Sequence, residues 1–150
     1  MGRRYSADGG ASIAAATTKT QWQLTAPATA AVLLHEIYCS QSTHDVSEQI
    51  DIELDRCSAA GGTPTAVTPR RDVNGEAVSS STFGSAPGTE PTYSATPLHK
   101  GSFNTLGGFT RRFVPPLEIP PSGIIALKLV SPAGQTTFTG RAGARWEEIG

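Results

Sequence analysis

The sequence predicts an all-β fold: a two-sheet sandwich, jelly-roll-like, of about eight strands, with an extended N-terminal arm. Three observations indicate this class. Apolar and polar residues alternate with a period of two in several stretches, which places alternate side chains on opposite faces of a strand. None of these stretches carries the apolar stripe of an amphipathic helix. The chain also holds 16 glycines and 11 prolines, in clusters that mark turns between short strands.

The stretch from residue 30 to residue 57 organises the prediction, because it reads as two strands joined by a polar turn. In the second strand Ile50, Ile52 and Leu54 alternate with acidic residues, so one face is apolar and the other acidic. The first strand is richer in apolar residues, as expected near the centre of a sheet or in a sandwich core. A hairpin that turns near residues 44–46 would pair these two strands with each other.

The hairpin also bears on the two cysteines of the chain, Cys39 and Cys57. In that register they lie about six residues apart along the ladder, on the order of 20 Å, which is too far for a disulfide. Two free thiols, made in a reducing cytoplasm, are therefore predicted.

Further strands are predicted on both sides of this pair. They cover residues 12–25, 65–68, 93–103, 108–114, 123–130 and 136–147. The stretch GIIALKLV at 123–130 is the best core strand, since burial of each large side chain is worth about 1.5–3 kcal/mol, and it should be central in its sheet. The stretch 65–68 is flanked by prolines and should either lie at a sheet edge or be confined to a few residues.

Three other segments have distinctive compositions. In the last strand one face carries Phe138, Gly140, Ala142, Ala144 and Trp146, and the other face carries Arg141, Gly143 and Arg145. The prolines of 115–121 predict an extended connector, because proline removes a backbone donor. Residues 69–92 predict a long irregular loop, with room for a short strand between 76 and 83.

At 150 residues the chain predicts one sandwich domain, residues 12–150, preceded by the arm at residues 1–11. The net charge of −1 gives no electrostatic reason to expect nucleic-acid binding. No apolar run reaches the length of a membrane span, and no apolar leader segment is found near residue 1. We therefore expect neither a nucleic acid nor a membrane as partner.

Catalytic motifs are missing from the sequence. No G-x-S-x-G elbow, phosphate-binding loop or G-x-G-x-x-G fingerprint occurs. His35, His44 and His99 have no zinc-ligand spacing with the cysteines. The row Asp51, Glu53 and Asp55 is interpreted as a solvated strand face, or an edge charged against aggregation, rather than a glycosidase pair. A calcium site stays open for this row, although no EF-hand spacing occurs. No catalytic, cofactor-binding or metal-binding residue is predicted, and the protein is not expected to be an enzyme.

Arginines are the candidates for binding a partner. Arg and Tyr are enriched at protein interfaces, and the planar guanidinium group suits carboxylates. The candidates are Arg3, Arg4 and Tyr5 on the arm, and the paired bases Arg70, Arg71, Arg111 and Arg112. The alternative interpretation of the paired bases is surface solubility.

Several stretches together resemble a known group of proteins. They are RRYSADGGASIAAATTKTQWQLTAPATAAVLLHEIYCS, ELDRCSAAGGTPTAVTP, TEPT and the terminal ARWEE. Their order, from an early strand ending near a proline through R…GGT…T…TP to an aromatic-Glu-Glu end, resembles small virion proteins of tailed bacteriophages, similar to capsid decoration (cement) proteins. The resemblance covers nearly the whole chain through short structural motifs, and it brings no catalytic residues.

The resemblance implies a β-sandwich or jelly-roll subunit on the capsid surface, made in the host cytoplasm. It implies a homotrimer at quasi-threefold positions that clamps neighbouring subunits of the major capsid protein against internal DNA pressure. The cysteines and the connector at 115–121 do not belong to the pattern, so the oligomeric state and the attachment geometry stay open.

Two other functions remain open at this stage. The chain could be a head–tail or tail-fibre component of the virion. It could also be a carbohydrate-binding β-sandwich, which would expose aromatic side chains as a platform for sugars. Trp22 and Trp146 distinguish the latter, because two buried indoles would count against it.

Overall fold

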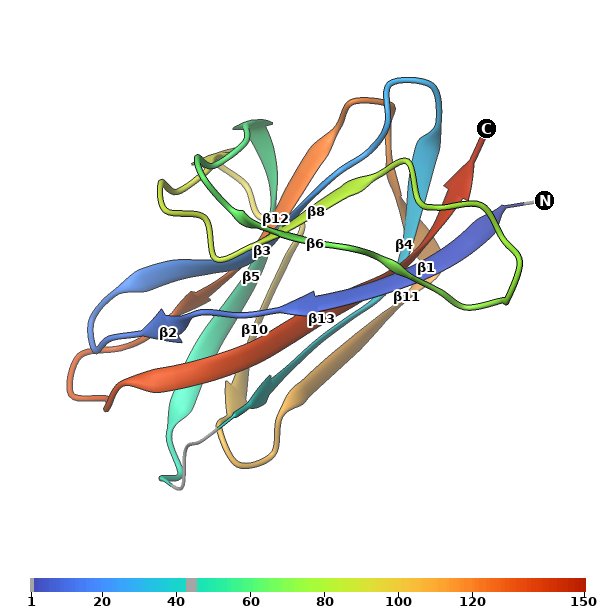
Figure 1. Ribbon diagram of the computed structural model, residues 1–150. Helices are drawn as coiled ribbons and strands as arrows, with labels where there is room; N and C mark the ends of the chain where they lie inside the picture. Colours follow the sequence, from blue (N-terminus) through green and yellow to red (C-terminus); the bar gives the residue numbers. More distant parts are fainter. Residues whose placement is uncertain (1, 43–45) are drawn as a thin grey trace.

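The computed structural model describes residues 2–42 and 46–150, and these residues form an all-β sandwich, as predicted (Figure 1). The strands are β1 (Arg3–Gly9), β2 (Ser12–Ile13), β3 (Thr18–Thr25), β4 (Ala31–Gln41), β5 (Gln49–Ala59), β6 (Thr65–Val67), β7 (Arg70–Arg71), β8 (Thr82–Ser85), β9 (Thr92–Tyr93), β10 (His99–Asn104), β11 (Phe109–Ile119), β12 (Ile124–Val130) and β13 (Phe138–Ile149). Among these residues no helix is long and apolar enough to cross a membrane.

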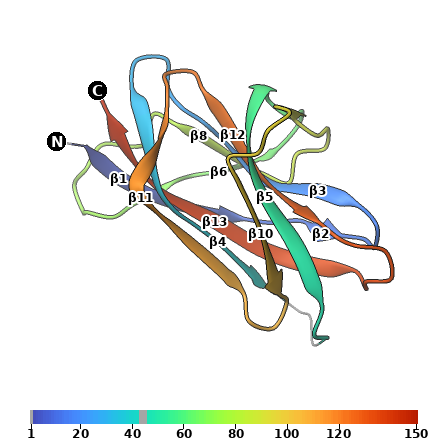
Figure 2. The same ribbon diagram turned by 180° about the vertical axis from the view of Figure 1, so that it is seen from behind.

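The strands form two antiparallel sheets, seen from both sides in Figures 1 and 2. The first sheet has the order β11-β4-β13-β1-β7, with β2 beside β13. The second sheet has the order β10-β5-β12-β3-β8-β6, with β9 beside β5. Their inner faces pack on one core, and each has an outer face.

The pairing of the long strands is that of a jelly roll. The first long strand pairs with the last, and the others follow inward: β1 with β13, β3 with β12, β4 with β11 and β5 with β10. This is the order of a long hairpin wrapped into two sheets. The predicted jelly-roll-like sandwich is confirmed in these eight strands, and the short β2, β6, β7, β8 and β9 extend it.

Aromatic rings link the two sheets through the core. Phe83 of β8 stacks on Trp146 of β13 with ring centroids 5.8 Å apart, and its centroid lies 5.3 Å from that of Trp22. The ring centroid of Tyr5, on the neighbouring strand β1, lies 6.2 Å from that of Trp146. Aromatic pairs contribute about 0.5–1.5 kcal/mol each beyond their buried area, so this row holds the layers together.

Two core predictions are confirmed. Strand β12 is central, since it pairs with β3 on one side and β5 on the other, and Ile125, Leu127 and Leu129 are fully buried. The face of β13 that carries Trp146 is buried along its length. The edge position predicted for 65–68 is also confirmed, because β6 ends the second sheet.

The predicted hairpin between residues 30 and 57 is wrong. Strand β4 pairs with β11 and β13, whereas β5 pairs with β10 and β12 in the opposite sheet. Alternation identifies strands but not their partners, and each of these strands lies inside its own sheet. Cys39 and Cys57 are both free, as predicted, although they lie in different sheets rather than along one ladder. His44 lies outside the described residues.

The N-terminal residues also differ from the prediction. Arg3–Gly9 is not an arm but strand β1, which pairs with β13 from Glu148 to Ala142 and with β7 on its other side. Tyr5 and Ala7 point into the core at 0% and 1% exposure, so the sandwich begins at residue 3 and not at residue 12. Tyr5 is the one large apolar side chain that this strand buries, so its sequence gave only a weak apolar pattern.

Two predicted irregular segments contain strand. Residues 115–119 belong to β11, which resumes its pairing with β4 at Leu117 after an irregularity that follows Arg112. Strand β8, within the predicted loop 69–92, pairs with β3 and β6. Proline-rich and serine-rich composition hid both, because their pairing depends on distant strands.

Candidate partner-binding face

A β-bulge in β4 shapes the outer face of the first sheet. His35 has no opposite residue in either neighbouring ladder, because pairing on both sides passes from Glu36 directly to Leu34. Leu34 and Ile37 both point into the core at 0% exposure, while His35 and Glu36 between them are half-buried. Bulges re-aim side chains in this way, and here the bulge turns two adjacent polar residues outward.

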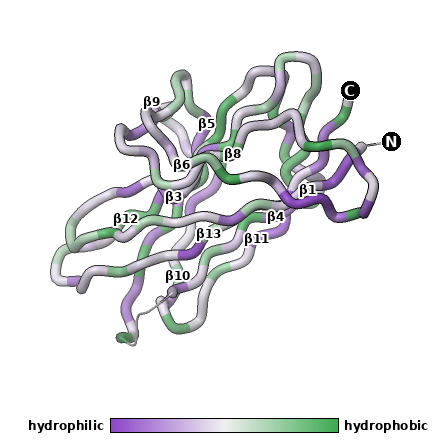
Figure 3. The backbone as a smooth tube through the Cα atoms, in the orientation of Figure 1, coloured by the Kyte–Doolittle hydropathy of each residue, from purple (hydrophilic) through white to green (hydrophobic). Residues whose placement is uncertain are grey.

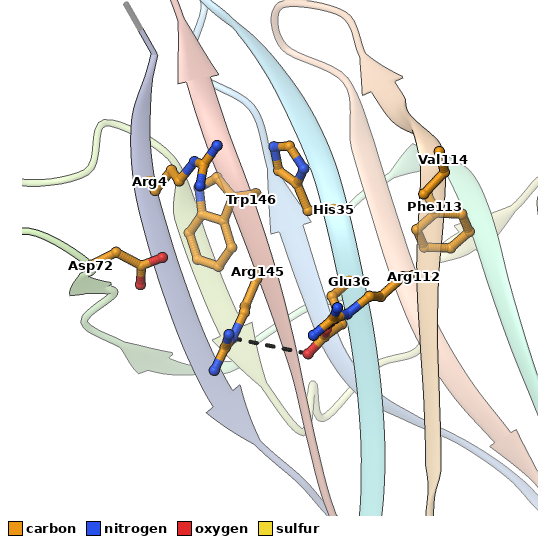
Figure 4. Close-up of a pocket in the computed structure, with 9 residues that line it drawn as sticks. All are labelled: Arg4, His35, Glu36, Asp72, Arg112, Phe113, Val114, Arg145 and Trp146. Atoms are coloured by element: carbon orange, nitrogen blue, oxygen red, sulfur yellow. Dashed lines mark hydrogen bonds and ion pairs between the residues drawn. The ribbon is translucent and has the colours of Figure 1, made fainter.

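A shallow groove of about 300 Å³ lies over the bulge. Figure 4 shows its side chains, which come from β1, β4, β11 and β13 and from the turn after β7. They are Arg4, His35, Glu36, Asp72, Arg112, Phe113, Val114, Arg145 and Trp146. The groove is open and strongly charged, and its dashed line joins Arg145 to Glu36 across two neighbouring strands.

Ion pairs run across this face from strand to strand. Glu36 Oε2 lies 2.7 Å from Arg112 Nε, and Glu36 Oε1 lies 4.0 Å from Arg145 Nε. Glu147 Oε2 lies 3.7 Å from Arg4 Nε and 3.2 Å from His35 Nε2. The pairs join all four long strands of the sheet.

The cations lie further out than the anions. The side chains of Arg4, Arg70, Arg112 and Arg145 are 64%, 65%, 77% and 58% exposed. Their partners Asp8, Glu36 and Glu147 are 26%, 13% and 19% exposed. We call these four arginines the arginine face. Each guanidinium group has five N–H donors, so the pairs leave donors directed to solvent.

Three predicted residues lie on this face and one lies in the core. Arg4, Arg70 and Arg112 belong to the arginine face, and Arg70 pairs with Asp8. Figure 3 shows hydrophilic residues gathered where β1 begins and β7 pairs with it. Tyr5 is buried, and its hydroxyl donates to the Ala77 carbonyl oxygen at 2.9 Å. The prediction of Tyr5 as a surface anchor is therefore corrected.

The other predicted arginines do not join the network. Arg3 and Arg71 are exposed on β1 and β7. Arg111 lies on the edge strand β11, with its guanidinium carbon 6.0 Å from the centre of the Phe113 ring. Arg145 was missed as a site residue, although its alternation with buried Trp146 placed it on the outer face.

The acidic row of β5 differs from the predicted solvated face. Asp51 is exposed and accepts a hydrogen bond from Ser102 Oγ at 2.7 Å. Glu53 lies 2.8 Å from Lys100 Nζ and 3.0 Å from Lys128 Nζ, and Asp55 lies 3.2 Å from Lys128 Nζ. Asp55 is fully buried, so the prediction is wrong for the inner part of the row. We call Glu53, Asp55, Lys100 and Lys128 the Lys128 cluster.

Two neighbouring carboxyl groups in this cluster have opposite pKa shifts. Burial raises the pKa of Asp55, and the positive charge of Lys128 offsets this only in part. Burial also acts to raise the pKa of Glu53, but hydrogen bonds and the charges of Lys100 and Lys128 outweigh it and lower that pKa. Such divergence is a known sign of acid and base roles, though structural ion pairs also produce it.

Among residues 2–42 and 46–150 no group of three or more His, Cys, Asp or Glu side chains is placed to hold a metal ion. The arrangement of this part of the chain offers charged binding surfaces instead. Comparison with models of protein families finds no match, and searches of curated proteins and of solved structures find none either.

Proposed function

We propose that this chain is a virion structural protein, a capsid decoration protein that binds the outside of the major capsid lattice and stabilises the head. The arginine face is the observation that carries the proposal. It is a strand-built surface whose outermost charges are guanidinium groups, and guanidinium groups bind carboxylates in two-point geometry. The partner surface on the capsid would be acidic.

The fold supports a structural role, in which the chain binds a partner, rather than a catalytic one. Sandwiches host many unrelated functions, so the fold alone would not select this one. Here, however, four long strands carry the arginine face, and ladders on both sides hold β1, β4 and β13. The sequence resemblance to decoration proteins supplies the identity of the partner in this proposal.

Self-association as a homotrimer belongs to the same proposal. The edge strand β11 supports it, because Val114 is 92% exposed there beside the half-buried Phe113. An edge strand offers unpaired backbone groups to a second copy of the chain, and such a contact would also cover Val114.

The alternatives differ in how the structure bears on them. A head–tail or tail-fibre component would use the same face at another place on the particle. A carbohydrate-binding module is disfavoured, since Trp22 and Trp146 are buried at 0% and 1% exposure. The exposed large apolar residues of the described chain are aliphatic, so it has no exposed aromatic platform.

The test uses heads of the encoding phage assembled without this protein. Purified protein is mixed with them and co-sedimented, and we expect saturable binding that weakens as salt rises. The double variant Arg112→Glu with Arg145→Glu should lose binding while remaining folded. Arg56→Glu is the matched control, because Arg56 is exposed on β5 in the other sheet. Equal binding by both variants, or no binding by the wild type, would overturn the proposal.

A further inference from the structure

The Lys128 cluster places an amine beside a buried carboxyl group on the neighbouring strand. In the pairing of β12 with β5, Lys128 lies opposite Glu53, and Ala126 lies opposite Asp55. Lys128 Nζ therefore reaches both carboxyl groups, at 3.0 Å from Glu53 and 3.2 Å from Asp55. The side chains of Lys128 and Asp55 are 14% and 1% exposed.

The carboxyl group of Asp55 lacks the hydrogen bonds that a buried ionised carboxylate requires. Both of its carboxyl oxygens are buried, and neither accepts a hydrogen bond of good geometry. An ionised carboxylate can accept several hydrogen bonds, and leaving them unmade in a buried place is costly. Conversion of the pair to an amide would remove both charges from this site.

A lid of side chains covers the amine. The Tyr93 ring lies 4.2 Å from Lys128 Nζ. The Tyr93 hydroxyl donates to Glu90 at 2.7 Å, and Glu90 pairs with Lys19 of β3 at 3.2 Å. The ring is thus held over the pair. Exclusion of water favours condensation of an amine with a carboxyl group over hydrolysis of the product.

We propose that Lys128 and Asp55 form an intramolecular isopeptide bond, with Glu53 transferring the proton. One proton first passes from the Lys128 ammonium through Glu53 to the Asp55 carboxylate, which gives a neutral amine and a carboxylic acid. Nζ of Lys128 then attacks the carboxyl carbon of Asp55, and a C–N bond forms. Glu53 carries a second proton from Nζ to the hydroxyl group as one C–O bond breaks, so the hydroxyl departs as water and Glu53 ends ionised as it began. The ammonium and carboxylate become one neutral amide, so the net charge of the chain does not change and no cofactor is consumed.

The environments of the three groups suit these roles. Burial favours the neutral form of Asp55, whose carboxyl carbon is the electrophile. The lysines keep Glu53 ionised and able to accept a proton. Burial favours the neutral amine of Lys128, but the two carboxylates outweigh it and raise its pKa, so the ammonium is the starting form. Loss of its proton to Glu53 is therefore the step that activates the nucleophile.

Mass spectrometry of the intact, denatured protein tests the bond. The wild type should weigh less than its sequence mass by one water molecule, and a protease digest should give a branched peptide joining residues 55 and 128. Lys128→Arg and Asp55→Ala should restore the full mass, and Glu53→Gln should slow or prevent the loss.

Lys100→Arg is the matched control, because Lys100 touches Glu53 but is 67% exposed and lies on β10. It should keep the loss of one water. A wild type at full sequence mass without a branched peptide would overturn the proposal and leave the cluster as an ion pair only. The wild-type mass and branched peptide need no variant to fold, and they are independent of capsid binding.

Discussion

The two outer faces of the sandwich use the same kinds of residue to opposite effect. On the first sheet the cations of the ion pairs are 58% to 77% exposed. On the second sheet Lys128 is 14% exposed and lies beneath Tyr93. Exposed pairs contribute little to stability and leave donors for a partner. Buried pairs are strongly destabilising when one member is removed. Cover by Tyr93 of the short strand β9, which no sequence pattern indicates, distinguishes the structural cluster from the binding face.

The largest expected effect lies in the covered cluster. Lys128→Ala leaves Glu53 with Lys100 alone and leaves Asp55 without its cation in a buried place. We expect the free energy of unfolding to fall by about 3–5 kcal/mol. Denaturant unfolding measures it, and a fall below about 1 kcal/mol, typical of exposed pairs, would remove the contrast between the two faces.

Glu148 is a buried carboxylate that is held by uncharged serine and backbone donors instead of a lysine, so it extends the comparison between covered and exposed charges. Glu148 accepts hydrogen bonds from the hydroxyls of Ser79 and Ser81, each at 2.6 Å, and from the backbone N–H groups of Ser81 and Ser80 at 2.9 and 3.2 Å. These hydrogen bonds attach residues 79–81, which precede β8, to strand β13. Glu148→Ala should cost about 2–3 kcal/mol in the free energy of unfolding, because hydrogen bonds to a charged group are lost.

The same carboxylate makes stability depend on pH. Burial acts to raise the pKa of Glu148, but the serine hydrogen bonds outweigh it and lower the pKa. The unfolded chain, with a pKa of about 4.3, then binds protons more readily than the folded one. The stabilisation that ionised Glu148 provides is therefore complete above about pH 5. It is lost as the pH falls through the pKa of Glu148 in the folded protein.

Unfolding of the wild type and of Glu148→Gln, compared between pH 6 and pH 3, measures this dependence. The stability difference between them should shrink as the solution becomes acidic. A difference that stays constant over that range would show that the serine hydrogen bonds do not depend on the charge of Glu148.

The smallest expected effect on stability lies on the arginine face. Arg112→Ala removes the ion pair with Glu36, whose arginine side chain is 77% exposed. The free energy of unfolding should therefore change by no more than about 0.5 kcal/mol. Thermal unfolding at low and moderate salt checks this. A fall of about 2 kcal/mol in the free energy of unfolding would contradict this, because it would show that the arginine face stabilises the fold rather than leaving its donors for a partner.

Local patterns predicted much of the fold. Alternation in β5 and β12 identified the buried Ile52, Leu54 and Leu127, because a period of two is visible within a few residues. The pairing of β4 and β5 was not predictable in this way, since strand partners are chosen by the whole sandwich. Strand β1 was missed because Gly2, Gly9 and Gly10, together with two adjacent arginines, give residues 1–11 the composition of a free terminus.

The site was less predictable than the fold. The spacing of three between buried Leu34 and Ile37 breaks the period of two, and this is the signal that could have identified the bulge. The burial of Asp55 left no local trace, because it depends on segments far along the chain that pack beside β5, such as β12 and β9. Arg4, Arg70 and Arg112 were identified by composition alone, and only the fold brings them onto one face with Arg145.

Cryo-electron microscopy of the native particle tests most directly whether this sandwich holds an acidic protein surface through its arginine face. The account predicts copies of the sandwich on the outside of the head, with Arg4, Arg112 and Arg145 against carboxylates of the major capsid protein. A particle whose surface lacks this chain, or one in which the arginine face points into solvent while another face makes the contact, would contradict it.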